Sequence, residues 1–397
     1  MTKSLLRYLN YFFVTLFLRT ERKILIRDFM WFFSLKRRVY HDYDSAKKQI
    51  SLHAAANWLI NNQQYNSDRG FSTYRIVEGH TSSYPETSGY IIDSLFSYAD
   101  KWNRREVIPE LFRCADWLLE VQRPSGGWPS GYINENKSEV VFNTGQVIRG
   151  LLKAYSQSRE SKYLHACERA GNWLCEIQEK DGSWKKFAFM NVQRVYETYV
   201  SAPLLDLWKV TGNELYKNAA VKNIDWVIQN KMQENGWLED CDNTIRHNER
   251  PILHTIAYTL DGILDCAVIL DESFYVEKVQ ISADALLRIF TERNYLGGRY
   301  DRRWNTTESL ICTGGAQISI VWMKLYKITG ESRYLNAAQK MNSLLCFVQS
   351  ATFTLRREVN GALQGSFPLW GRYEPFAFPN WATKYLLDAL MLEKELL

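Results

Sequence analysis

A glutamine between two tryptophans occurs twice in this chain with the same spacing. The segment WLLEVQRPSGGW begins at Trp117 and the segment WLCEIQEKDGSW begins at Trp173. A repeat of this length is typical of an array of helical hairpins. Looser copies lie on both sides, and their members are Trp58, Gln63 and Phe71; Trp226, Gln233 and Trp237; Gly297 to Tyr300; and Gly365 to Phe367.

A polar cluster that opens an apolar helix occurs six times. Steps of 57, 54, 57, 59 and 67 residues separate the copies, by subtraction of the positions Glu86, Asn143, Glu197, His254, Thr313 and Asn380. Helices that are apolar nearly all round alternate with helices whose apolar residues keep helical spacing, which indicates an inner ring inside an outer ring. The predicted fold is an all-α (α/α)6 toroid of six helical hairpins. It forms one domain over residues 44–397, preceded by a helical segment over residues 1–43.

The N-terminal segment is basic and aromatic. Residues 1–41 contain nine Lys or Arg against Glu21 and Asp28, a net charge of +7. The apolar run from Leu5 to Leu18 is too short to span a bilayer, and it lacks a small-residue cleavage site, which disfavours a secretory signal. A second aromatic run, Phe29 to Phe33, precedes Lys36, Arg37 and Arg38. Two interpretations stay open: amphipathic helices that contact an anionic membrane, or a cap that packs on the toroid.

The charge of the remaining chain argues against a nucleic-acid partner. The whole sequence carries +5, so the predicted toroid carries about −2, which is +5 less the +7 of the N-terminal segment. Phosphate binding would need the positive charge on the folded body. The seven cysteines are odd in number and scattered. They favour reduced thiols and a cytoplasmic location, at the inner face of the membrane if the N-terminal segment binds lipid.

Glycine turns are expected to end the outer helices. They occur at Gly126-Gly127, Asp181-Gly182, Asn235-Gly236 and Gly297-Gly298, and each leads to an inner helix. All six loops should therefore emerge on one face, which forms a funnel suited to a ligand. We expect Trp128, Trp184 and Trp237 to hold these loops as scaffold residues, with the glutamines capping backbone groups.

The two tryptophan segments resemble the Gln-Trp repeats of the terpenoid cyclases. Six helical hairpins also resemble the six-hairpin glycosidase, lyase and sugar-epimerase superfamily. Both groups are α/α toroids, so the resemblance implies architecture over about residues 44–397 more than activity. The C-terminal segment GSFPLWGRYEPFAFPNWATKYLLDAL, which begins at Gly365, is similar to the ending of uncharacterised toroid proteins encoded with bacterial surface-polysaccharide enzymes.

Motifs for metal or alkene chemistry do not match. Terpenoid cyclases of the alkene-protonating class use a D-x-D-D segment, and this sequence has none. Related prenyltransferases and lanthionine cyclases bind zinc through Cys, His and sometimes Asp. The residues that could bind zinc here are Asp240, Cys241, Asp242, His254 and Cys312. Their spacing fits neither family, so we expect no metal and no cofactor.

The starts of the inner helices carry the candidate site. Paired carboxylates can act as acid and base on a sugar, and aromatic rings can stack on pyranose faces. The catalytic candidates are Glu197 first, then Glu86, with His254 and Tyr258 transferring or orienting protons. Helix-dipole or capping roles are alternatives for these groups. The substrate-binding candidates are Tyr84, Asn143, Tyr196, Tyr199, Asp242, Asp301, Asn380 and Trp381.

Three classes of function follow. The first is an enzyme that acts on a poly- or oligosaccharide by hydrolysis, elimination or epimerisation in bacterial surface-glycan biosynthesis. The second is a terpenoid cyclase or prenyltransferase-like enzyme that stabilises carbocations with its aromatic lining. The third is a non-catalytic glycan-binding scaffold held at the membrane.

Overall fold

The structure is a computed structural model. It describes residues 3–33, 43–244, 247–307, 309–353 and 355–397. The predicted basic run Lys36, Arg37 and Arg38 lies outside the described residues.

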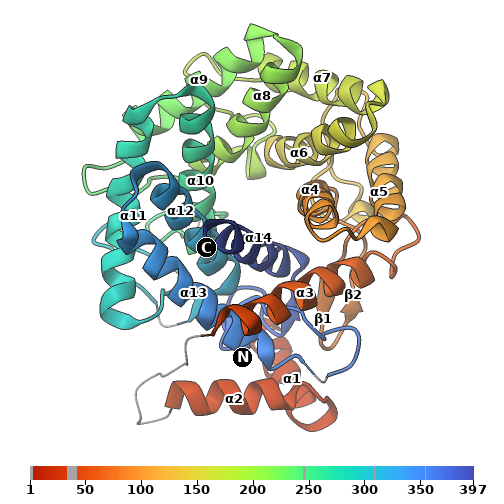
Figure 1. Cartoon of the computed structure of the whole chain (residues 1–397), viewed down its shortest axis with the longest axis vertical. Coiled ribbons are helices and arrows are strands. Elements are labelled where there is room, and N and C mark those ends of the chain that lie inside the picture. The colour runs from red at the N-terminus through yellow and green to blue at the C-terminus, as the bar shows by residue number, and fades with distance from the viewer. Residues whose placement is uncertain (1–2, 34–42, 245–246, 308, 354) are drawn as a thin grey trace.

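Twelve of the described helices form two concentric rings (Figure 1). Each inner helix contacts the next, and α14 contacts both α3 and α4, which closes the ring. The predicted (α/α)6 toroid is therefore confirmed. The inner helices are α4 (Pro85–Lys101), α6 (Val141–Ser158), α8 (Thr198–Thr211), α10 (Leu253–Leu270), α12 (Cys312–Thr329) and α14 (Asn380–Leu396). The outer helices are α3 (Ser45–Asn62), α5 (Ile108–Glu120), α7 (Ser161–Glu176), α9 (Glu214–Asn230), α11 (Ser273–Arg293) and α13 (Ser332–Ser350).

Burial explains the apolar composition of the inner helices. Among the helices described, α10 is the one with the length and hydropathy of a membrane span, and 78% of that stretch is buried inside the protein. It packs between α8 and α12 in the inner ring. An inner helix is surrounded by protein on all sides, so it is apolar all round without entering a lipid phase.

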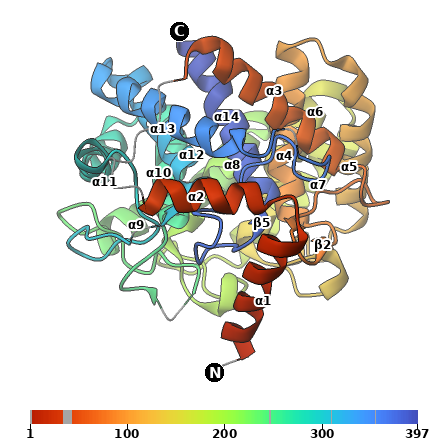
Figure 2. The ribbon, with the colours of Figure 1, turned by 90° about the horizontal axis from the view of Figure 1, so that it is seen from below.

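Short elements shape the loops between the helices. They are β1 (Tyr74–Arg75), β2 (Gly79–His80), β3 (Leu310–Ile311), β4 (Ser366–Phe367) and β5 (Ala377–Phe378), with 3₁₀ turns at Arg105–Val107, Ile133–Glu135, Phe189–Asn191 and Val195–Glu197. Strand β1 pairs antiparallel with β2 and β5, and β3 pairs antiparallel with β4. The last loop of the chain is thus joined to the first and fifth loops. Figure 2 shows β2 and β5 on the side of the ring opposite the C-terminus of α14.

The repeated glutamines join neighbouring hairpins. The Nε2 of Gln122 donates to the carbonyl oxygen of Gly126 at 2.8 Å and to that of Ala166, on the next outer helix, at 2.9 Å. The Nε2 of Gln178 donates in the same way to Gly182 at 3.0 Å and to Ala219 at 2.8 Å. Each glutamine thus bonds its own loop to the next outer helix. The predicted capping role of these glutamines is confirmed.

The second tryptophan of each motif is a scaffold residue. Trp128 and Trp184 are almost fully buried. Their indole Nε1 atoms donate to the carbonyl oxygens of Leu118 at 2.7 Å and Leu174 at 2.9 Å. Each ring thus holds its loop against the end of its own outer helix, as predicted.

The glycine turns do not end the outer helices. Helix α5 ends at Glu120 and α7 ends at Glu176, whereas Gly126 and Gly182 come six residues later with φ of 106° and 94°. A Cβ at Gly126 would overlap the carbonyl oxygen of Arg169 on the next outer helix. These glycines therefore allow a tight approach between hairpins rather than a helix stop.

The sixth hairpin carries a further copy of the motif, in which the glutamine and the glycine are farther apart in sequence than in the other copies. The Nε2 of Gln349 donates to the carbonyl oxygen of Gly361 at 2.7 Å and to that of Ser51 at 3.1 Å. Gly361 has a φ of 91°. The sixth hairpin is thus joined to the first by the same bonds, and Gly361, rather than the predicted Gly365, is the turn glycine.

The N-terminal helices pack on the outside of the ring. Helices α1 (Lys3–Leu18) and α2 (Arg22–Phe33) lie beside the junction of the first and last hairpins (Figure 1). The fully buried Glu21 pairs with Arg356 at 2.7 Å. The fully buried Asp28 accepts from the backbone N–H of Leu369 at 2.7 Å. The segment therefore caps the toroid, which was one of the two open interpretations.

The opposite face of α1 and α2 is apolar and exposed. Figure 2 shows α1 projecting past the loops, away from the C-terminus of α14. The exposed apolar side chains are Leu5, Leu6, Leu9, Phe13, Phe17, Leu18, Ile26, Phe29, Met30 and Phe33. We call this set the outer apolar face. Because these side chains are exposed, the N-terminal helices could contact a membrane as well as cap the toroid.

Candidate active site

Glu86 occupies the first turn of α4 and is half-buried. Burial raises the pKa of its carboxyl to about 7, and the nearby Tyr84 hydroxyl partly opposes this shift. Burial also raises the pKa of Tyr258 and of Tyr373, and the Glu86 carboxylate raises both further. These phenols therefore lie within electrostatic reach of Glu86. A carboxyl with this pKa is present as both acid and base near neutral pH.

His254 lies in the first turn of α10 and is held neutral. Burial lowers the pKa of its imidazole to about 4, an effect that Gln317 opposes. The Nδ1 of His254 lies 2.7 Å from Oε1 of Gln317. Since a carbonyl oxygen only accepts, Nδ1 carries the hydrogen, and Nε2 is left with a lone pair. The ring centroid lies 4.4 Å from that of Tyr258 and 5.7 Å from that of Tyr373.

Aromatic rings from four inner helices meet beside Glu86 and His254. The centroid of Tyr258 lies 4.9 Å from that of Phe142, 4.7 Å from that of Tyr199 and 5.9 Å from that of Tyr385. The hydroxyl of Tyr258 is buried and has no hydrogen-bond partner among the described residues. The closed ring thus brings together residues that are far apart in sequence.

Glu197 differs from Glu86 in its surroundings. It ends a 3₁₀ turn just before α8, it is fully buried, and neither carboxyl oxygen has a hydrogen-bond partner among the described residues. Burial raises the pKa of its carboxyl well above the ordinary value, and the buried Arg194 opposes this shift. Burial therefore favours the protonated form of the Glu197 carboxyl and keeps it away from solvent.

Two predicted binding residues have part of their polar groups engaged. The Nδ2 of Asn143 donates to the carbonyl oxygen of Pro129 at 2.8 Å. The Nε1 of Trp381 donates to the hydroxyl of Tyr373 at 2.9 Å. Asn380 is fully buried, and both polar atoms of its side chain lack a partner among the described residues. Of these residues, Asn380 has the most hydrogen-bonding capacity left for a ligand.

Two predicted binding carboxylates hold loops in place. Asp242 is fully buried, pairs with Arg299 at 2.9 Å and accepts from the backbone N–H of Thr244 at 3.0 Å. Asp301 accepts from the backbone N–H of Asn305 at 2.9 Å, and its hydrogen bonds lower its pKa despite the opposing effect of burial. Both side chains stabilise turns, which is the physical reason for placing acidic residues there.

Tyr84 and Tyr196 each pack on one neighbouring aromatic ring. The half-buried Tyr84 packs on Tyr132 at a centroid distance of 5.6 Å. Tyr196 packs on Phe142 at 5.3 Å. Tyr132 and Tyr373 are loop residues that the sequence pattern did not single out, because they lie outside the repeated helix starts.

The thiols of Cys241 and Cys312 are buried in their protonated form. Burial raises the pKa of Cys241 to about 12 and that of Cys312 well above its ordinary value. A zinc ligand must be the thiolate. Within the described ranges, no group of three or more His, Cys, Asp or Glu side chains is arranged to hold a metal ion.

A layer of buried charges crosses the ring below the aromatic residues. Lys324 pairs with Asp261 at 2.6 Å, and Lys384 pairs with Asp388 at 2.7 Å. The guanidinium of Arg149 lies 4.2 Å from the centroid of Tyr199. Sequence analysis missed these charges, although they recur on the inner helices one to three turns after the predicted helix starts.

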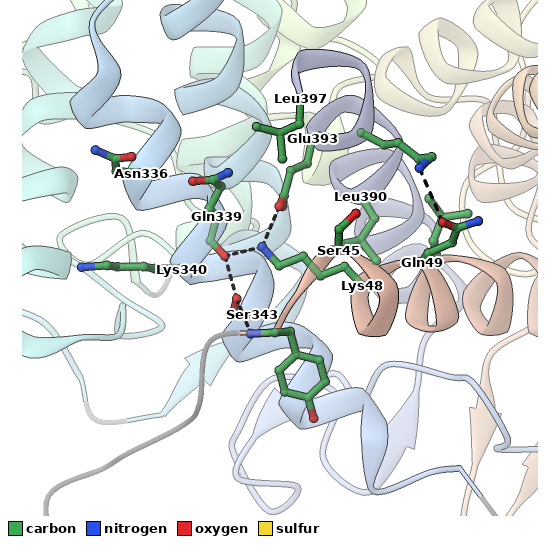
Figure 3. Close-up of a pocket in the computed structure, with 13 residues that line it drawn as sticks. Ser45, Lys48, Gln49, Asn336, Gln339, Lys340, Ser343, Leu390, Glu393 and Leu397 are labelled. Atoms are coloured by element: carbon green, nitrogen blue, oxygen red, sulfur yellow. Dashed lines mark hydrogen bonds and ion pairs between the residues drawn. The ribbon is translucent and has the colours of Figure 1, made fainter.

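Two cavities flank the ring at opposite ends. One, of about 690 Å³, lies between the start of α3, α13 and the end of α14 (Figure 3). Its Lys48 donates to Glu393 at 2.6 Å and to the carbonyl oxygen of Gln339 at 2.9 Å. The other, of about 860 Å³, lies between the N-terminal helices and the loops and reaches Tyr373. We call it the loop-side groove, and it is the cavity that borders the candidate site.

Comparisons with known proteins agree on the architecture. The chain is similar to the solved structure of an unsaturated glucuronyl hydrolase specific for heparin, with a TM-score of 0.73 and 15% identity, covering 89% of this chain and 98% of that chain. It is also similar to the unsaturated glucuronyl hydrolase of Bacillus sp. GL1, with a TM-score of 0.68 and 13% identity, covering 87% and 96% of the two chains. No family model matches the chain.

A curated relative gives a second, shorter likeness. Squalene–hopene cyclase of Zymomonas mobilis is 25% identical over 145 residues, which is 33% of this chain and 21% of the cyclase. The match therefore spans about a fifth of that protein. Together these likenesses identify an α/α toroid, which six-hairpin glycosidases and terpenoid cyclases share, and they agree with the resemblance drawn from the sequence. At such identities they establish the fold alone.

Proposed function

We propose that this protein is a carbohydrate-active enzyme, of the hydrolase, lyase or epimerase type, that acts on a poly- or oligosaccharide in bacterial surface-glycan biosynthesis. The observation that carries the proposal is Glu86, a half-buried carboxyl whose pKa is raised to about 7 beside a group of tyrosines. The solved glucuronyl hydrolases with the same fold support a saccharide substrate by analogy.

In this proposal Glu86 is the acid and His254 the base. The protonated carboxyl of Glu86 gives its proton to the departing or enolic oxygen of the sugar. The lone pair on Nε2 of His254 takes a proton from the attacking water or from a sugar carbon. Tyr258 and Tyr373 contact the His254 ring and respond to the Glu86 charge, so they lie where a substrate would bridge the two groups.

Glu86 replaces Glu197 as the first catalytic candidate. A general acid must come within hydrogen-bonding distance of its substrate. The Glu197 carboxyl is fully buried, whereas Glu86 retains exposure. Glu197 is then a buried residue of the turn that carries Tyr196, out of contact with a substrate.

We propose peripheral contact with an anionic membrane through the outer apolar face. Ten large apolar side chains are exposed there. The exposed Arg22 and Lys23 lie at the start of α2 and would meet anionic headgroups. This contact would place the protein at the inner face of the membrane, where surface glycans are assembled.

Mass spectrometry of reaction products tests the enzymatic proposal. The purified protein would be incubated with soluble oligosaccharides, with and without uronic acids, and with glycan from the producing cell. Gain of water indicates hydrolysis, loss of a fragment as an unsaturated sugar indicates elimination, and an unchanged mass with a new stereoisomer indicates epimerisation. If no saccharide is altered but one binds, the protein is a glycan-binding scaffold.

A terpenoid or prenyl substrate is the second candidate. The aromatic group around Tyr258 and the partial likeness to squalene–hopene cyclase favour it, since aromatic faces stabilise carbocations. Conversion of an isoprenoid to a cyclic product by the purified protein, with no action on any saccharide, would put this candidate first.

A further inference from the structure

The loop-side groove is lined by an apolar set and a basic set of side chains. Tyr8, Phe32 and Phe33 of the N-terminal helices and Trp370 of the last loop form the apolar wall. Arg250, Arg299 and Arg372 form the basic wall. The groove therefore brings together the N-terminal helices, the last loop and the two loops that precede α10 and α12.

The basic wall retains positive charge for a ligand. Arg299 pairs with Asp242 at 2.9 Å. Arg250 and Arg372 are exposed, and neither forms an ion pair with a residue in the described ranges. Arg372 lies close enough to Tyr8 to lower the pKa of its phenol, against the larger raising effect of burial. Two guanidinium groups are therefore available, and planar guanidinium forks suit phosphate oxygens.

The apolar wall continues into the outer apolar face. The ring of Phe33 lies 4.6 Å from that of Phe29, and both side chains are more than half exposed. Phe32 packs on Phe367 at a centroid distance of 5.2 Å, which fixes this wall to the toroid. An apolar chain in the groove would thus leave it over Phe33 and Phe29 toward lipid.

The other end of the groove meets the candidate active site. Tyr373 lines the groove, contacts the ring of His254 at 5.7 Å and accepts from the Nε1 of Trp381 at 2.9 Å. A ligand held at the arginines would therefore extend one end toward Glu86 and the other toward the outer apolar face.

We propose that the loop-side groove binds the phosphorylated head of a lipid-linked saccharide. The inference rests on the proposed saccharide chemistry and names the form in which that substrate arrives. Arg250 and Arg372 bind the phosphate, the lipid chain lies along Phe33, and the saccharide reaches the funnel past Tyr373. A reaction that attaches sugars to a lipid phosphate must then supply the substrate.

Binding of a short isoprenoid diphosphate to the full-length protein tests the groove. The probes are farnesyl diphosphate, farnesol and inorganic pyrophosphate, with affinity measured by calorimetry. We expect farnesyl diphosphate to bind at least about tenfold more tightly than either other probe, because it contacts both the apolar wall and the basic wall. The double variant Arg250→Gln with Arg372→Gln should weaken its binding by about ten- to hundredfold, the usual effect of losing charge-assisted hydrogen bonds.

Matched controls separate the outcomes. Arg105→Gln removes an exposed arginine outside the groove and should leave binding unchanged. Equal binding of pyrophosphate would assign the groove to a soluble phosphate, and equal binding of farnesol would reduce it to an apolar site. Full competition by vesicles of anionic phospholipid that carry no isoprenoid would assign it to bilayer headgroups. Each of these results overturns the proposal.

Two separate measurements on the wild type distinguish this proposal from the proposed function: turnover of a soluble saccharide and binding of farnesyl diphosphate. Saccharide turnover without binding of farnesyl diphosphate would contradict the groove proposal and leave the proposed function intact. Binding of farnesyl diphosphate without action on any saccharide would leave the groove in place and remove the enzymatic proposal.

Discussion

Glu86 and Glu197 show how strongly burial decides the role of one residue type. Both lie near the start of an inner helix, where a carboxylate is favoured by the helix dipole. Glu86 keeps contact with solvent and has a pKa of about 7. Glu197 is fully buried near Arg194, and burial raises the pKa of its carboxyl well above the ordinary value. A raised pKa alone therefore does not make a carboxyl a proton donor, because the substrate must also come into contact with it.

Glu86→Gln should abolish most of the activity without unfolding the protein. We expect turnover to fall by about two to four orders of magnitude, the usual contribution of a positioned acid. Wild-type activity should fall as pH rises above about 7, because the acid form of Glu86 is lost. The exposed Glu234→Gln is the matched control and should keep full activity and the wild-type pH profile. An active Glu86→Gln enzyme would contradict the assignment.

The same carboxyl should affect stability in a defined pH range. Its pKa is raised in the folded protein from an ordinary 4.5 to about 7. The folded state then binds more protons than the unfolded state between these values, so the contribution of Glu86 to the free energy of unfolding falls as pH rises through this range. Thermal unfolding of Glu86→Gln should lack this component. The comparison requires melting temperatures of both proteins at pH 5 and at about pH 8.

The hairpin element is held by a set of bonds that recurs around the ring. Gln122, Gln178 and Gln349 each donate to a loop glycine carbonyl and to a carbonyl of the adjoining outer helix. Each bond set joins one hairpin to the next. The element therefore encodes its own contact with the next copy, which is how a repeat protein closes into a ring.

Trp128→Ala and Trp184→Ala should destabilise the fold. Each substitution removes a buried ring and the hydrogen bond of its indole, at a cost of about 3–5 kcal/mol. Chemical denaturation measures the change. Trp208, which is only half-buried and bonds Glu214 at 2.9 Å, is the control, and its alanine variant should lose much less. If stability were unchanged and ligand binding were lost, the buried tryptophans would instead be binding-site residues.

At the scale of the whole molecule, the N-terminal helices connect the two ends of the chain. Glu21 binds Arg356 and Asp28 binds the loop at Leu369. These loops also supply Trp370, Arg372 and Tyr373 to the loop-side groove. The N-terminal cap and the loop-side groove therefore share the last loop. The outer apolar face lies on the side of the cap that faces solvent.

Substitution of the outer apolar face tests the membrane contact. The quadruple variant Phe13→Ser, Phe17→Ser, Phe29→Ser and Phe33→Ser changes exposed side chains, so we expect its melting temperature to stay close to that of the wild type. Its sedimentation with anionic vesicles should fall strongly, and binding of the wild type should weaken in high salt. Leu215→Ser, on the exposed part of α9, should leave sedimentation unchanged. Wild-type protein that fails to sediment would leave the helices as a cap only.

The repeat pattern by itself determined the architecture. Apolar periodicity, the spacing of Trp117, Gln122 and Trp128, and six polar helix starts predicted the toroid and the scaffold role of the tryptophans. Each of these signals lies within a single repeat or in its recurrence along the chain, so the sequence pattern alone carries it. The stretched sixth copy at Gln349 and Gly361 was missed because its spacing is longer.

Only the tertiary structure decided how the helix starts face the funnel. Successive residues of a helix turn by about 100°, so one residue of offset changes which side chain points inward. The 3₁₀ turn before α8 buries Glu197, whereas the regular start of α4 leaves Glu86 half-exposed. The groove depends on contacts between residues more than 300 positions apart, such as Tyr8 and Trp370. No local pattern records such contacts, because they exist only once the ring has closed.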